Sequence, residues 1–173
     1  HFTALGVAVS RMCRDPLLQY GPKALADHKK GLCTYDVEQV VLAIVVTTGI
    51  ASIFLTKDYT PDYNSGLAHA VFYAMTSYPV IEEKHLHGEV VGFGVLLALL
   101  VDKDEEEFEA IYRLNRALGL PVSLEEIEIT EEQWEECETR IPDMSDVAHY
   151  PYRVTKEMLD AAMARLRERA AQE

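Results

Sequence analysis

Two histidines near the middle of the chain combine a residue type and a spacing that suit a metal ion. His69 lies in the stretch Gly66-Leu67-Ala68-His69-Ala70, and His87 opens His87-Gly88-Glu89 eighteen residues later. A neutral imidazole is a good ligand for zinc or iron(II), and small neighbouring residues allow a second backbone to come close. We therefore identify His69 and His87 as candidate metal ligands. The alternative is two ordinary core or surface histidines, because motifs of this kind also arise by chance.

Other polar residues near the pair have simpler interpretations. Glu89 falls in the first turn of the helix predicted after His87, where a carboxylate interacts well with the helix dipole; the alternative is that it orients an imidazole. We expect His85 to be a surface residue. The chain has no Gly-rich phosphate loop and no Ser-His-Asp elbow, so we assign no catalytic and no cofactor-binding residue.

The length and amino-acid composition of the chain are those of an ordinary globular protein. It has 173 residues, an apolar fraction of 49%, a charged fraction of 26% and a formal net charge of −13. This charge argues against nucleic acid and anionic membrane surfaces as partners, because both require basic patches. Cys13, Cys33 and Cys137 are odd in number and widely spaced, which fits free thiols in the cytoplasm better than a disulfide framework.

Apolar residues recur at helical spacing along most of the chain, and no segment reads convincingly as a sheet. We predict an all-α fold, a bundle of about eight helices that forms a single domain over residues 1–173. The first helix should stop at Asp15-Pro16, and a second should open at Gly21-Pro22. The clearest further helices are expected at 34–55, 66–77, 87–101, 105–118 and 155–170.

The segment from Val40 to Leu55 is the most apolar of the predicted helices. A membrane span needs about 20 mostly apolar residues. This run is shorter and contains Thr47, Thr48 and Gly49. We therefore expect it to be a buried spine of the domain, surrounded by its neighbours.

The order of these motifs resembles the C-terminal helical domain of the glycerol dehydrogenase branch of the iron-containing alcohol dehydrogenases, a superfamily that also includes dehydroquinate synthase. The family pattern is a Gly-Leu…His-Ala helix, a short connector, and His-Gly-Glu before an apolar helix with Phe-Gly. This chain has the same elements at Gly66–Ala70 and at His87–Gly94. Its Leu118–Val122 and His149–Thr155 are similar to later family segments.

The resemblance implies a cofactor and a metal. Family members bind NAD on an N-terminal α/β domain and hold one Zn²⁺ or Fe²⁺ in the cleft between domains, with His69 and His87 at the positions of the two imidazole ligands. The family's third ligand, an Asp, would fall before residue 1. We therefore expect a metal site that is weak or vacant in this chain, and an NAD-binding domain that is missing upstream. Phe72-Tyr73 replaces a His-Asn pair that is common in the family.

We accordingly expect the helical, metal-binding domain of an NAD-dependent alcohol or glycerol-type polyol dehydrogenase, present as a fragment that is inactive alone. The alternative is a non-catalytic helical remnant or assembly module. The resemblance implies a small hydroxylated substrate for the parent enzyme. It also implies association with either the missing NAD domain or further copies of the chain. The cysteines and the net charge add the expectation of a cytoplasmic protein without nucleic acid or membrane as partner. Whether this chain is itself an enzyme stays open.

Overall fold

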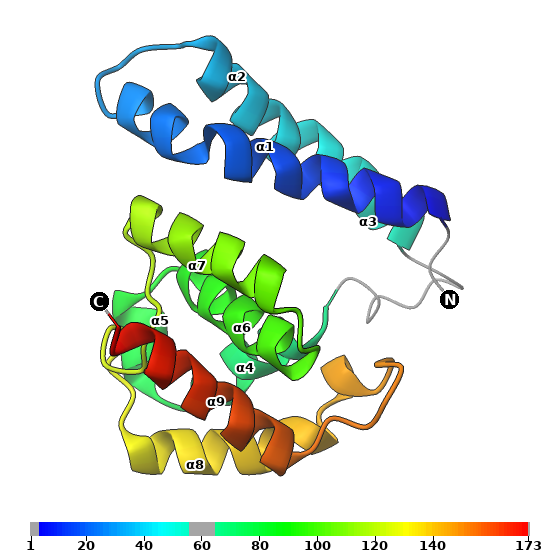
Figure 1. Cartoon of the computed structure of the whole chain (residues 1–173), viewed down its shortest axis with the longest axis vertical. Coiled ribbons are helices and arrows are strands. Elements are labelled where there is room, and N and C mark those ends of the chain that lie inside the picture. Colours follow the sequence, from blue (N-terminus) through cyan, green and yellow to red (C-terminus); the bar gives the residue numbers. More distant parts are fainter. Residues whose placement is uncertain (1–3, 56–64, 173) are drawn as a thin grey trace. The chain divides into compact units, whose positions relative to one another are not determined.

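The computed structural model describes residues 4–55 and 65–172. These residues are helical with no strand, and when the continuous segment 35–55 is taken as one helix they form eight α-helices (Figure 1). The all-α prediction is confirmed. The chain divides into two compact units, residues 1–64 and residues 65–173. The single-domain prediction for residues 1–173 stays a prediction.

The first unit is a helical hairpin. Helix α1 (Ala4–His28) packs against a continuous second helix, which consists of α2 (Tyr35–Leu42), a π-helical segment (Ala43–Thr47) and α3 (Thr48–Leu55). Side-chain hydrogen bonds to Asp27 stabilise the turn between the two helices. The Asp27 carboxylate accepts hydrogen bonds from Lys23 Nζ at 2.5 Å and from Thr34 Oγ1 at 2.8 Å. Thr34 therefore lies at the predicted start of the second helix. Its hydroxyl donates to Asp27 and does not cap the helix.

The predicted break at Pro16 is wrong. Helix α1 continues through both Pro16 and Pro22. Each proline removes one backbone donor from the helix. Packing along the second helix of the hairpin supplies the tertiary contacts that keep α1 continuous, which shows how tertiary context overrides local propensity. The sequence of residues 59–65 predicts a loop before Gly66, and all of it except Ser65 lies outside the described part of the chain.

The prediction of a buried spine at 40–55 is also wrong. Ile44, Val45 and Ile53 are 57%, 69% and 75% exposed, while Ala43 and Ala51 are buried. Within the first unit the packing partner of this helix is α1, and one helix can cover only one face of another. The small alanines lie on the covered face, and large apolar side chains are left on the others.

One described helix, Tyr35–Ile53, is long and apolar enough to cross a membrane by length and composition. The core helix of a soluble protein and a signal sequence can pass the same test, so this observation is weak evidence for a span. The expectation that the chain does not act in a membrane stays a prediction.

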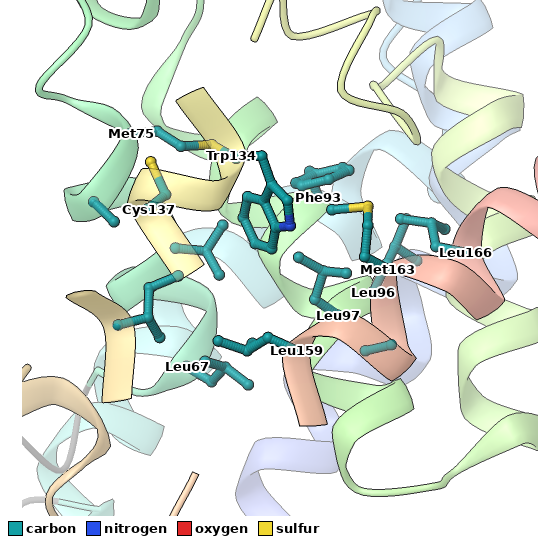
Figure 2. Close-up of a cluster of buried hydrophobic side chains, with 14 of the residues drawn as sticks. Leu67, Met75, Phe93, Leu96, Leu97, Trp134, Cys137, Leu159, Met163 and Leu166 are labelled. Carbon is teal, nitrogen blue, oxygen red and sulfur yellow. The ribbon is translucent and has the colours of Figure 1, made fainter. Parts of the chain in front are cut away.

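The second unit is built around α6 (His87–Val101), which contacts α4 (Leu67–Met75), α7 (Glu105–Leu118) and α9 (Lys156–Ala170). Helix α8 (Glu131–Arg140) closes the core against α4 and α9, and α5 (Pro79–Lys84) links α4 to α6. Figure 2 shows the core that these helices share. Its labelled side chains are Leu67, Met75, Phe93, Leu96, Leu97, Trp134, Cys137, Leu159, Met163 and Leu166.

Local signals fix several of these helix ends. Asp104 caps α7 by accepting from the backbone N–H of Glu107 at 3.1 Å, and Gly119 ends that helix with a φ of +74°. At the start of α8, Thr130 and Gln133 form a capping box. The predicted bounds of α6 and α7 agree with the structure. Two short 3₁₀ turns, η3 (Ile141–Asp143) and η4 (Ser145–Val147), follow α8.

Candidate metal site

The structure brings the two candidate ligands together within the second unit. His69 lies in the first turn of α4, and His87 is the first residue of α6. The centroids of their imidazole rings are 5.7 Å apart, with the ring planes inclined by 44°. Two residues eighteen positions apart in sequence therefore lie side by side. A centroid distance of 5.7 Å leaves room for an ion between the two rings, and binding of a metal stays a prediction.

An unusually close contact between α4 and α6 sets this arrangement. A β-carbon at Gly94 would lie 2.5 Å from the backbone oxygen of Ala68 and 2.9 Å from its Cα. Real β-carbons essentially never come so close to backbone atoms, so only glycine allows this approach. Ala68 directly precedes His69, and Gly94 lies two turns after His87. The glycine at position 94 therefore allows the close contact between α4 and α6.

Aromatic side chains border the histidine pair. The ring of Phe72 meets that of His87 edge-on, with the centroids 4.4 Å apart and the planes inclined by 79°. Tyr73 lies 6.4 Å from His69 between ring centroids and is 45% exposed. The Phe72-Tyr73 pair thus lies directly beside the imidazoles. Edge-to-face contact of this kind restricts how the His87 ring can turn.

The surroundings of His69 favour its neutral form. Burial lowers the pKa of His69 below its ordinary value of 6.5, and the charge of the nearby His87 lowers it further. The negative charge of Asp146 acts in the opposite direction and is the smallest of the three effects. A metal binds an imidazole only through a deprotonated nitrogen, so the net direction suits a ligand.

The start of α4 is held by a distant part of the chain. The ring of Tyr150 lies 3.6 Å from the place of a β-carbon at Gly66, and the backbone N–H of Leu67 donates to the Tyr150 hydroxyl. This hydrogen bond satisfies one of the donors that a helix N-terminus leaves free, and Gly66 has no side chain to do so. Sequence reasoning missed this contact, as it missed Asp146, because some eighty residues separate the partners. The only signal was the resemblance of the closing segment.

The other histidine near the pair does not join it. His85 was expected at the surface, yet its side chain is only 12% exposed. Its Nδ1 lies 3.7 Å from Glu89 Oε2, and its Nε2 lies 3.7 Å from Glu128 Oε2. Glu89 belongs to α6, and Glu128 belongs to the turn before α8. Glu89 itself accepts from the backbone N–H of Leu86 at 3.0 Å, which agrees with the predicted cap-like role.

The residues present fit part of a metal site. Two neighbouring imidazoles, one of them favoured in its neutral form, are suitable ligands for Zn²⁺ or Fe²⁺. In residues 4–55 and 65–172, no group of three or more His, Cys, Asp or Glu side chains is placed to hold an ion. The described part of the chain therefore offers two direct ligands, and other groups or solvent would have to supply the remainder.

Comparison with known proteins relates the chain to glycerol dehydrogenases. Glycerol dehydrogenase from Pseudomonas putida is 34% identical to the chain over 135 residues, which are 75% of this chain and 33% of the relative. Glycerol dehydrogenase from Escherichia coli O6:H1 is 30% identical over 134 residues, with the same coverage. The chain is homologous to glycerol dehydrogenases.

The fold agrees with this relationship. The crystal structure of a probable glycerol dehydrogenase from Sinorhizobium meliloti 1021 matches 99% of this chain with a TM-score of 0.80, at 24% sequence identity. The match covers 47% of that structure. The glycerol dehydrogenase homology thus extends over about a third of the length of the curated relatives, and the shared helical fold over about half of the solved chain. No protein-family model matches.

Proposed function

We propose that this chain is the helical, metal-binding part of an NAD-dependent, metal-containing dehydrogenase that acts on a small alcohol or polyol. The homology to glycerol dehydrogenases supports the reaction class. The observation that carries the proposal is the pairing of His69 with His87, whose ring centroids lie 5.7 Å apart on two helices in close contact. The absence of a Gly-rich loop from the sequence implies that another part of the parent enzyme holds the NAD.

In this proposal His69 and His87 would hold Zn²⁺ or Fe²⁺. Such an ion polarises a substrate hydroxyl and lowers its pKa, which prepares the alcohol for hydride transfer to a nicotinamide. The chain's own residues keep His69 neutral by burial and orient His87 through the ring of Phe72. Phe72 and Tyr73 give the site an aromatic border, so the substrate would meet fewer polar groups on this side than a polyol prefers.

The rival interpretation is a non-catalytic helical module that kept the scaffold and lost the chemistry. It assigns no role to two closely spaced imidazoles, and no observation in the described residues favours it. We also propose a soluble, cytoplasmic location, supported by the three free cysteines.

Isothermal titration of the chain with Zn²⁺ tests the proposal. We expect weak binding of one ion per chain, because the described residues offer two direct ligands, and we expect both His69→Ala and His87→Ala to abolish that binding. His28→Ala is the matched control, because His28 lies at the end of α1 in the first unit and should leave binding unchanged. Absence of binding by the unmodified chain, or binding that survives both substitutions, would favour the non-catalytic module.

A further inference from the structure

Four aromatic side chains of α4 and α6 make a closed cycle of contacts, which we call the four-ring cluster. Between ring centroids, His69 lies 5.7 Å from His87, His87 lies 4.4 Å from Phe72, Phe72 lies 5.3 Å from Tyr73, and Tyr73 lies 6.4 Å from His69. These distances are typical of interacting aromatic pairs. The two imidazoles form one half of the cluster, and the rings of Phe72 and Tyr73 form the other half.

The sequence of α4 accounts for this arrangement. Phe72 and Tyr73 follow His69 by three and four residues, so all three side chains lie on one face of the helix. The close contact of Gly94 with α4 then brings in the fourth ring, His87, from the start of α6. A molecule bound at the two imidazoles therefore has the rings of Phe72 and Tyr73 beside it.

Solvent reaches part of the four-ring cluster. Phe72 is partly buried and packs against the core, whereas His87 is exposed and Tyr73 is 45% exposed. Leu86, which directly precedes His87, adds a large apolar side chain that is 73% exposed. The cluster is thus anchored in the core through Phe72 and accessible at Tyr73 and His87, so a small molecule can approach the imidazoles along the Tyr73 ring.

We propose that Tyr73 is a specificity-determining residue of the alcohol site, and that the substrate carries an alkyl or aryl group beside its reacting hydroxyl. This inference rests on the proposed function. An apolar substituent gains free energy when it leaves water to lie against the rings of Tyr73 and Phe72. A further hydroxyl placed there would lose hydrogen bonds to water, and Phe72 offers none in return. A polyol such as glycerol is therefore the poorer fit.

The test compares two thiols that differ only in polarity, 1-propanethiol and 1-thioglycerol. Their sulfur replaces the reacting oxygen, and its binding to Co²⁺ on the whole 173-residue chain is followed by the sulfur-to-cobalt absorption band. His69→Ala measures the background from free Co²⁺ and from the chain's own cysteines. The quantity of interest is the ratio of the two dissociation constants, because intrinsic differences between the thiols are the same for every variant.

We expect the unmodified chain to prefer 1-propanethiol, and we expect Tyr73→Asn to lower that preference by about fourfold, the effect of burying roughly one CH₂ group. Tyr73→Phe keeps the ring and should keep the preference. Tyr35→Asn is the matched control, since Tyr35 is another exposed tyrosine at a helix of the first unit and should leave the ratio unchanged. Circular dichroism of each variant checks that the helices are intact.

A second measurement needs no variant. With Zn²⁺ in place of Co²⁺, the methyl protons of bound 1-propanethiol should show nuclear Overhauser contacts to a tyrosine ring of the unmodified chain. Absence of such contacts while the thiol is bound would overturn the inference.

The remaining outcomes separate this inference from the proposed function. If the unmodified chain shows no cobalt band above the His69→Ala background, the proposed function fails and this inference fails with it. If the band is present but Tyr73→Asn and Tyr35→Asn give the same ratio, the inference alone is overturned. If Tyr73→Phe lowers the preference as much as Tyr73→Asn does, the Tyr73 hydroxyl is responsible and the apolar contact is wrong.

Discussion

Gly94 of α6 and Ala68 of α4 are closer than any side chain at position 94 would allow. The β-carbon of an alanine there would lie 2.5 Å from the carbonyl oxygen of Ala68, and that oxygen belongs to the backbone and cannot rotate away. The contact is adjacent to His69 in sequence and lies on the helix that begins with His87. It therefore couples the packing of the core to the spacing of the candidate ligands.

Gly94→Ala should destabilise the second unit. Inserting a methyl group into a contact with no room typically costs about 1–3 kcal/mol, because backbone must shift. Gly92→Ala is the control in the same helix, since its β-carbon would lie at an ordinary 3.8 Å from Asn115 Nδ2. That variant should be neutral or gain roughly 0.5–1 kcal/mol from better helix propensity. Urea unfolding of both variants measures the difference, and equal stabilities would show that α4 and α6 are not in close contact.

Truncating the exposed apolar helix of the first unit should have little effect. Ile44 is 57% exposed, so Ile44→Ala should cost less than about 1 kcal/mol. Leu97 is fully buried in the core of the second unit, and Leu97→Ala should cost about 2–5 kcal/mol. Urea melts of the two variants provide the comparison. A large loss for Ile44→Ala would mean that this face is covered in solution.

The imidazole of His69 should titrate below 6.5. Burial is the main cause of the lowered pKa and the charge of His87 is the second, so His87→Gln should raise the pKa of His69. Asp146→Asn should lower it, because the carboxylate acts in the opposite direction. Proton NMR of the imidazole ring during a pH titration measures all three values. An unchanged pKa of His69 in His87→Gln would contradict the close pairing of the rings.

The same shift has a consequence for stability. Because the pKa of His69 is lower in the folded chain than in the unfolded one, the unfolded chain binds a proton first as the pH falls. The contribution of His69 is therefore complete above 6.5 and is lost as the pH drops through its folded pKa. His69→Gln should flatten this part of the stability profile. An identical profile in both proteins would show that His69 is not perturbed by burial.

The 173-residue chain should not reduce NAD with an alcohol. Hydride transfer requires a held nicotinamide, and the sequence has no phosphate-binding loop to hold one. The assay is NADH absorbance with glycerol or a related diol at high pH in the presence of Zn²⁺. A full-length glycerol dehydrogenase serves as the positive control. Sustained turnover by the pure chain would require a nucleotide site that the sequence does not reveal.

The sequence predicted those features that depend on local pattern. His69 and His87 were both identified from neighbouring residues, because small residues beside a histidine have direct structural meaning. The bounds of α7 followed from its helical pattern of apolar residues and from Gly119 directly after it. The homology to glycerol dehydrogenases was found from the same short motifs and their order.

The predictions that were wrong or missing concern features that depend on tertiary contacts. Pro16 was expected to end a helix, but packing within the hairpin keeps α1 continuous. The apolar run at 40–55 was expected to be surrounded, although composition alone does not reveal how many neighbours a helix has. Asp146 and Tyr150 were missed because only folding brings their segment to α4.

The most direct test of this account is the location of a bound metal. Crystals of the chain grown with Zn²⁺, measured on both sides of the zinc absorption edge, would show it by anomalous scattering. The account predicts one peak between the imidazoles of His69 and His87, with Zn–N distances of about 2.0–2.1 Å. An empty space between these two rings at saturating Zn²⁺, or an ion bound only elsewhere on the chain, would contradict the central claim.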